Sequence, residues 1–214
     1  MPETRERILR TALHLFARDG YEAVSVSDIA GALGMTKGAL YRHYENKRAI
    51  FDSIVQRMYQ VDAARARAFD VPEHTWAEAP ESYRDTAAES ILRFTVGQFD
   101  FWTKDPFAAD FRRMLTLEQY RDPEMAALYS RCLTAGPVAY MEDLFRAMME
   151  RGALRQGDPR QLAVAYYAPL LLLIQIADGP DAAGLDCAAL LAGHTAAFFR
   201  ANAPAEEKGG SAHV

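Results

Sequence analysis

Helical periodicity runs through almost the whole 214-residue chain and restricts its fold more than any other feature of the sequence. Apolar residues recur three and four positions apart, which is the spacing of the buried stripe on a helix. No segment shows the strict alternation, bounded by turn dipeptides, that a half-buried strand would give. With 50% hydrophobic and 25% charged residues, the chain also has the composition of a globular protein. The sequence therefore predicts an all-α fold.

The N-terminal part predicts three helices separated by recognisable caps. An amphipathic helix over residues 8–16 is followed by Gly20 as a stop. Ser25 and Asp28 have the spacing of a capping box, which satisfies two free amides at the start of a second helix. Gly34 lies where the second helix should end with a residue in the left-handed conformation, and Thr36 can cap the start of a third helix. This order is that of a helix-turn-helix, whose second helix enters the major groove of DNA.

The third predicted helix presents a basic and aromatic face. Lys37 can donate to guanine edges, and Gly38 lets the backbone approach a base because it has no Cβ. Tyr41 and His43 can donate to phosphate oxygens, while Arg42 can serve a phosphate or a base. An ordinary solvated helix face is the alternative interpretation of the same residues.

A long fourth helix is predicted from an Asn46 cap through Val61. Lys47 lies just past the cap, where free amides at a helix N-terminus already favour an anion such as phosphate. Residues 1–48 hold eight Lys or Arg against six Asp or Glu, whereas the whole chain carries a formal charge of −5. The basic face is therefore local, and a strongly basic whole-molecule nucleic-acid binder is excluded.

Residues 20–30, 33–44 and 46–47 closely resemble the N-terminal domain of the TetR family of bacterial transcriptional regulators. The resemblance covers roughly residues 5–55 and implies a homodimer that binds double-stranded DNA and carries a helical C-terminal domain that senses a small-molecule effector. Arg42 departs from a frequent aromatic residue, which affects base preference, and Tyr44 replaces a common Phe, which affects packing. The resemblance implies base contacts from Lys37 and Gly38, and phosphate contacts from Thr36, Tyr41, His43 and Lys47.

Beyond a loop at residues 70–80, six further helices are predicted, with Gly and Pro in the gaps between them. Their expected ranges are about 82–103, 106–117, 123–134, 137–151, 159–177 and 185–202. The sequence thus divides into a DNA-binding domain at residues 1–48, a ligand-binding and dimerisation domain at 49–203, and a disordered tail at 204–214.

Aromatic and methionine side chains are concentrated between residues 94 and 149. Such side chains can line a cavity between helices, with a few polar groups such as Thr95 to orient a guest. A filled core is the alternative for any one of them. The resemblance favours a pocket among these helices. The candidate ligand-binding residues are Met58, Phe94, Gln98, Phe101, Trp102, Phe111, Tyr140 and Leu144.

The last two predicted helices are apolar nearly all round, which requires burial on several sides. The uncharged stretch at residues 161–177 is shorter than the roughly 20 apolar residues of a membrane span, so we expect a buried helix and no membrane. Contact with a second copy would form a four-helix interface with twofold symmetry, and burial within one chain is the alternative. Such a dimer would hold two recognition helices about 34 Å apart and bind a near-palindromic operator.

Motifs of other function classes are missing from the sequence. Cys132 and Cys187 have no neighbours at ligand spacing, and the five histidines are scattered, so neither a disulfide framework nor a metal site is predicted. The charged N-terminus does not have the pattern of a signal peptide, which favours a cytoplasmic protein. Nucleophile elbows, zinc-protease motifs and phosphate loops are missing, so we expect no catalytic residue and no cofactor. The expected function is a ligand-responsive repressor; the alternative is a DNA-binding regulator whose C-terminal domain recruits a protein.

Overall fold

The computed structural model describes residues 2–180 and 184–204, and every regular element in these ranges is a helix, which confirms the predicted all-α class. The predicted disordered tail lies, from residue 205 onward, outside the described residues. The helices are α1 (Pro2–Asp19), α2 (Val26–Ala32), α3 (Lys37–Tyr41), α4 (Lys47–Ala68), α5 (Pro80–Asp85), α6 (Ala88–Lys104), α7 (Pro106–Glu118), α8 (Pro123–Leu133), α9 (Ala135–Glu150), α10 (Pro159–Ala177) and α11 (Cys187–Ala201).

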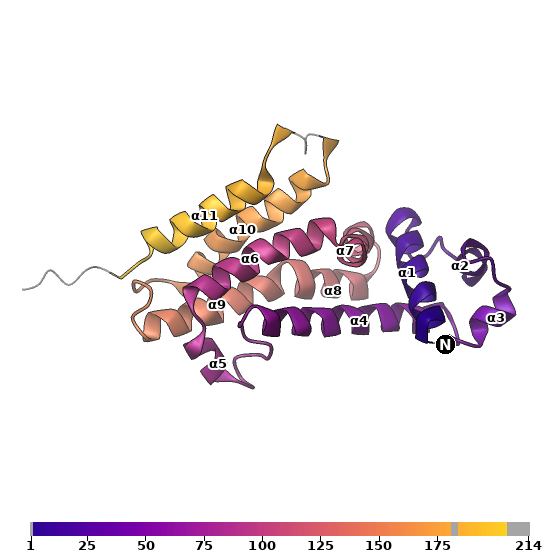
Figure 1. Cartoon of the computed structure of the whole chain (residues 1–214), viewed down its shortest axis with the longest axis horizontal. Coiled ribbons are helices and arrows are strands. Elements are labelled where there is room, and N and C mark those ends of the chain that lie inside the picture. The colour runs from indigo at the N-terminus through magenta and orange to yellow at the C-terminus, as the bar shows by residue number, and fades with distance from the viewer. Residues whose placement is uncertain (1, 181–183, 205–214) are drawn as a thin grey trace, which may run out of the picture.

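The molecule is elongated, and α1, α2 and α3 gather at one end of it (Figure 1). From this end α4 runs along the body toward α5, while α10 and α11 lie side by side along one edge (Figure 1). The domain boundary predicted after residue 48 falls in the first turn of α4. One continuous helix therefore joins the N-terminal unit to the rest of the bundle.

The predicted caps define the N-terminal helices. The Ser25 hydroxyl accepts from the Asp28 amide and the Asp28 carboxylate accepts from the Ser25 amide, so the capping box is confirmed. Gly34 has φ +65°, the left-handed conformation expected of it. Thr36 caps α3 by accepting from the Ala39 amide. Local chemistry alone therefore fixes where α2 ends and where α3 begins.

The prediction of one continuous helix over residues 82–103 is wrong, because the structure has two helices there, α5 and α6. At Thr86 the backbone is extended, with φ −67° and ψ 122°. The Arg151 guanidinium donates to the backbone carbonyls of Arg84 and Thr86. In a continuous helix these two carbonyls would accept hydrogen bonds from amides four residues later. The side chain of Arg151, the C-cap of α9, donates to them instead.

A buried carboxylate connects the N-terminal unit to α7. Glu118, at the end of α7, is 2% exposed and accepts a 3.0 Å hydrogen bond from the Tyr21 amide. Gly20 approaches the same carboxylate so closely that a Cβ there would lie 2.7 Å from an oxygen of Glu118. The turn after α1 is thus held against α7 by a charge-assisted hydrogen bond.

Replacing Glu118 by Ala should lower the free energy of unfolding by about 1–3 kcal/mol, because it leaves the Tyr21 amide without its acceptor. The matched control is Glu124→Ala, which removes an exposed carboxylate paired with Arg48 and should cost clearly less than Glu118→Ala. Urea unfolding followed by circular dichroism measures both. Equal losses in the two variants would show that the bond to Tyr21 stabilises the fold no more than an exposed ion pair does.

Candidate DNA interface and ligand cavity

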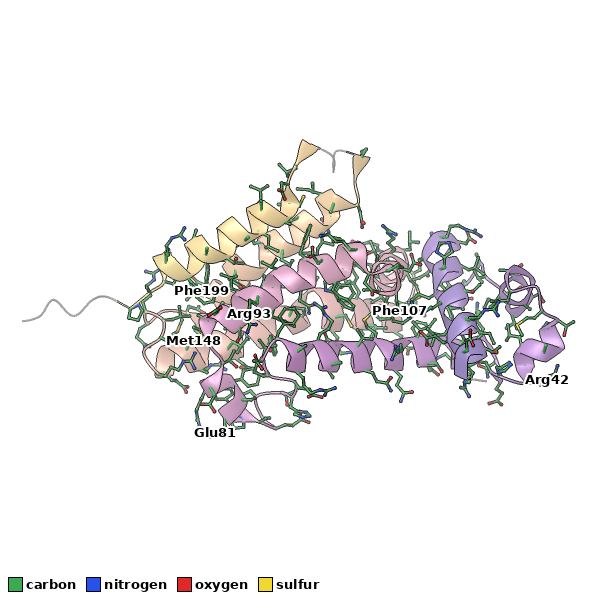
Figure 2. The ribbon with its side chains drawn as sticks, in the orientation of Figure 1. Arg42, Glu81, Arg93, Phe107, Met148 and Phe199 are labelled. Carbon is green, nitrogen blue, oxygen red and sulfur yellow. The ribbon has the colours of Figure 1, made fainter. Side chains whose placement is uncertain are left out.

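The face of α3 that points away from the body is accessible. Leu40 is completely buried beneath it, and Tyr44, which is 5% exposed, packs next to it. Figure 2 shows Arg42 at the outer end of the molecule, beyond α3. The residues of this face that are exposed are Thr36, Lys37, Gly38, Tyr41 and Arg42.

Lys37 and Tyr41 form a joint surface on this helix. The Lys37 ammonium lies 5.8 Å from the centroid of the Tyr41 ring, and the tyrosine is 44% exposed. Both side chains can therefore reach a ligand that approaches α3 from solvent. His43, one residue beyond the C-cap, is only partly exposed.

Lys47 lies at the N-terminus of α4, but its side chain turns back toward the end of α1. Its Nζ donates to the Tyr21 carbonyl at 2.8 Å and lies 4.2 Å from the centroid of the Tyr21 ring. The Glu22 carboxylate is 3.9 Å away. A phosphate at the start of α4 would meet a lysine that is already held in place, and the predicted contact stays a prediction.

A cavity of about 510 Å³ lies between α4, α6, α8, α9 and the loop at residues 72–75. This volume is within the range of about 300–1,000 Å³ that is usual for small-molecule sites. Five of the predicted ligand-binding residues line it: Met58, Phe94, Gln98, Trp102 and Tyr140.

The other three predicted residues do not line this cavity and belong to the packed core. Phe101 precedes Trp102 on α6 and faces a different side, where the Arg65 guanidinium lies 4.2 Å from its ring centroid. Phe111 and Leu144 are 0% and 1% exposed and are enclosed by core side chains. Thr95 lines a smaller adjoining hollow and pairs there with the Tyr166 hydroxyl at 2.8 Å.

Two tyrosine hydroxyls fix the loop that forms one wall of the cavity. Tyr140 donates to the Pro72 carbonyl at 3.0 Å, and Tyr83 donates to the His74 carbonyl at 2.9 Å. The two rings are 5.7 Å apart, and Phe94 lies 6.4 Å from Tyr140. Burial raises the pKa of Tyr83 to about 12, so the hydroxyl stays a donor. The rings of Tyr83 and Tyr140 therefore line the cavity while their hydroxyl groups already donate to the loop.

Sequence reasoning missed Asp62, which lines the cavity one helical turn beyond Met58. Its spacing of four residues from a predicted lining residue is the signal that could have found it. Desolvation raises the pKa of the Asp62 carboxyl, while a hydrogen bond from Gln98 and the charge of Arg65 oppose this. The Asp62 side chain is nevertheless exposed, and it opens to the cavity that it lines. Gln98 Oε1 is buried without a hydrogen-bond partner in the described structure.

The cavity wall also carries a cysteine. Cys132 also lines it, and burial, followed by the charge of Asp62, raises the pKa of this thiol to about 11. A thiol with a raised pKa is a poor nucleophile at neutral pH. Within residues 2–180 and 184–204, no group of three or more His, Cys, Asp or Glu side chains could hold a metal ion.

The outer faces of α10 and α11 expose several apolar and small side chains. By length and composition α10 is apolar enough to cross a membrane, yet Tyr166 and Leu170 on its other side are buried in the bundle. Leu172 is 57% exposed and Leu190 is 48% exposed. The exposed apolar or small residues of the two helices, which we call the α10–α11 face, are Val164, Ala165, Ala168, Leu172, Ala189, Leu190, Gly193 and Ala197.

Comparison with known proteins identifies the N-terminal unit. Residues 8–54 match the family model described as bacterial regulatory proteins, tetR family. A relative in Shigella flexneri, the HTH-type transcriptional regulator AcrR, is 44% identical over 52 residues, which are 24% of each chain. The chain spans about a quarter of the length of the curated relatives that it matches.

Solved structures extend the similarity to the whole fold. SmeT, the repressor of the Stenotrophomonas maltophilia multidrug efflux pump SmeDEF, in a complex with triclosan, is 20% identical with a TM-score of 0.67, covering 95% of this chain and 93% of that one. A transcriptional regulator from Saccharomonospora viridis in complex with choline is 23% identical with a TM-score of 0.64, covering 95% and 99%. The helix-turn-helix at residues 8–54 therefore matches the TetR family of bacterial regulatory proteins, and the entire chain shares the fold of these solved structures.

Proposed function

We propose that this protein is a transcriptional repressor that binds a palindromic operator as a homodimer and is released by a small apolar or amphipathic effector. The observation that carries the proposal is the accessible basic face of α3, joined by the single helix α4 to a cavity of about 510 Å³. The names of the relatives and of the structural neighbours, which include repressors and complexes with small molecules, support it.

In the proposed complex α3 enters the major groove. Lys37 reads a base edge and Gly38 allows the backbone to approach, because nothing lies within 4 Å of the position of its missing Cβ. Arg42 contacts a base or a phosphate at the outer end of the helix. The proposed phosphate contacts come from Thr36, Tyr41, His43 and Lys47.

The second copy covers the α10–α11 face. Monomeric proteins rarely leave large contiguous apolar surfaces in water, and small residues such as Ala168 and Gly193 let two helix pairs approach closely. A twofold axis at this face would generate the paired recognition helices that a palindrome requires.

Effector binding would act on DNA through α4. Met58 and Asp62 line the cavity, and Lys47 starts the same helix beside the helix-turn-helix. An effector that prefers the dimer spacing incompatible with DNA must bind less tightly on the operator, because coupling between the two sites is reciprocal.

A regulator that recruits a protein instead of binding an effector is the second candidate. It would need a cavity too small for a guest or an exposed apolar patch away from the dimer face. The volume of the cavity favours the small-molecule function.

Replacing Lys37 by Ala should weaken operator binding by about 1–3 kcal/mol, roughly 5- to 150-fold, because a side chain that reads a base is removed. The operator is first selected from a random DNA pool, and affinity is then measured by fluorescence anisotropy. Lys104→Ala, an exposed lysine at the end of α6, is the matched control and should bind as wild type does. If Lys37→Ala binds the selected palindrome as tightly as wild type, Lys37 is not a reader.

Replacing Leu172 by Asp should convert the homodimer to a monomer and weaken operator binding, because a charge would be buried at the centre of the α10–α11 face. Light scattering coupled to size exclusion measures the mass. Leu117→Asp on α7 is the control, since Leu117 is 42% exposed outside this face and its replacement should leave the dimer intact. A dimeric Leu172→Asp variant would contradict the proposed interface.

A further inference from the structure

Some polar groups that line the cavity already have a hydrogen-bond partner in the protein, and others do not. Two of its three tyrosines, Tyr83 and Tyr140, donate to backbone carbonyls of the loop, while the third, Tyr59, is 46% exposed. Its buried acceptor Gln98 Oε1 has no donor among the residues that the structure describes. A guest therefore meets acceptor atoms and ring faces, and it finds few hydroxyl groups to donate to it.

Three carboxylates line the cavity, and they differ in their counterions. Glu73 is paired with Arg67, and Asp143 is paired with Arg146 at 2.6 Å. Within residues 2–180 and 184–204, no such ion pair engages Asp62. The cation nearest in sequence, Arg65, donates to the Gly97 carbonyl at 2.7 Å and lies over the rings of Phe69 and Phe101.

The negative charge of Asp62 acts on two other groups that line the cavity. Burial is the main cause that raises the pKa of the Tyr140 hydroxyl, and Tyr83 and Asp62 raise it further. Asp62 also raises the pKa of the Cys132 thiol. The cationic lining residue Arg131 also borders the groove between α4 and α8. An anionic guest would have to place its charge at Arg131 and leave Asp62 uncompensated.

We propose that the cavity binds a lipophilic organic cation whose charge lies between the Asp62 carboxylate, Gln98 Oε1 and the aromatic rings of Phe94, Trp102 and Tyr140. Ring faces attract cations, and the Asp62 carboxylate, which lines the cavity and forms no ion pair within residues 2–180 and 184–204, supplies the charge that such a guest needs. This inference deepens the proposed function, because it rests on the cavity being the effector site.

The test uses probes of similar shape and opposite charge on the full-length protein. Tetraphenylphosphonium and the smaller benzyltrimethylammonium are the cations, and tetraphenylborate is the anion that matches the first of them. Isothermal titration without DNA should give saturable binding of at least one cation and binding of tetraphenylborate at least about tenfold weaker. Tetraphenylborate binding as tightly as the cations, or no binding of either cation, would overturn the proposal.

Two variants test where the charge lies. Asp62→Asn should weaken binding of the cation by about tenfold or more, because the counterion is lost. Asp143→Asn removes the same charge from the same cavity, but from a carboxylate already paired with Arg146, and should change affinity by less than about threefold. Equal weakening in both variants would mean that the cation responds only to the overall charge of the protein, and the assignment to Asp62 would be wrong.

Operator binding separates this inference from the proposed function. If the cation binds through Asp62 but does not release the selected operator, the cavity chemistry stands and the proposed release mechanism fails. If other compounds release the operator while cations bind no better to wild type than to Asp62→Asn, the repressor function stands and the cation site fails.

The variant Asp62→Asn should also be more stable than wild type at neutral pH, because the folded protein disfavours the charged carboxylate. Since the raised pKa lets wild-type Asp62 bind a proton as the pH falls, this gain should shrink with falling pH and vanish below about pH 4. Thermal unfolding across pH measures it, and a neutral-pH loss of stability in Asp62→Asn would contradict the described environment. The charged and titratable groups that line the cavity with Asp62, or act on it, are Tyr59, Arg65, Glu73, His74, Tyr83, Arg131, Cys132, Tyr140 and Asp143.

Discussion

The structure depends on one helix that belongs to both of its parts. The 22 residues of α4 extend about 33 Å at 1.5 Å per residue. Ile50 and Ile54 in its first half are completely buried against the N-terminal unit, whereas Met58 and Asp62 further along line the cavity. Since a packed helix moves as a rigid body, a displacement at the cavity must also move the helix-turn-helix or break the packing at its start.

The sequence predicted those features whose causes are local. The caps at Ser25, Thr36 and Asn46 follow from side chains that bond amides two or three residues away, so the helix-turn-helix could be located without coordinates. The cavity was predicted only in part, because packing against other helices decides which neighbour among Phe101 and Trp102 borders a void. The break between α5 and α6 could not be predicted either, since it depends on Arg151, distant in sequence.

The cavity retains polar groups at a cost to folding. A carboxylate with a raised pKa and a buried amide oxygen without a donor both destabilise the folded chain relative to an apolar lining. In the core outside the cavity, Arg112 by contrast donates to the Trp102 carbonyl and pairs with Asp178. An unpartnered acceptor and a carboxylate without an ion pair in the same cavity are typical of a binding site, where stability is given up for recognition.

The loop at residues 72–75 gives the cavity one wall that is not helical. Its carbonyls at Pro72 and His74 are held by Tyr140 and Tyr83, and a hydroxyl–carbonyl bond contributes a net stabilisation of about 1 kcal/mol. These two bonds, together with the buried Pro72 side chain, hold the loop in place, so the shape of this wall depends on two tyrosines that come from different helices.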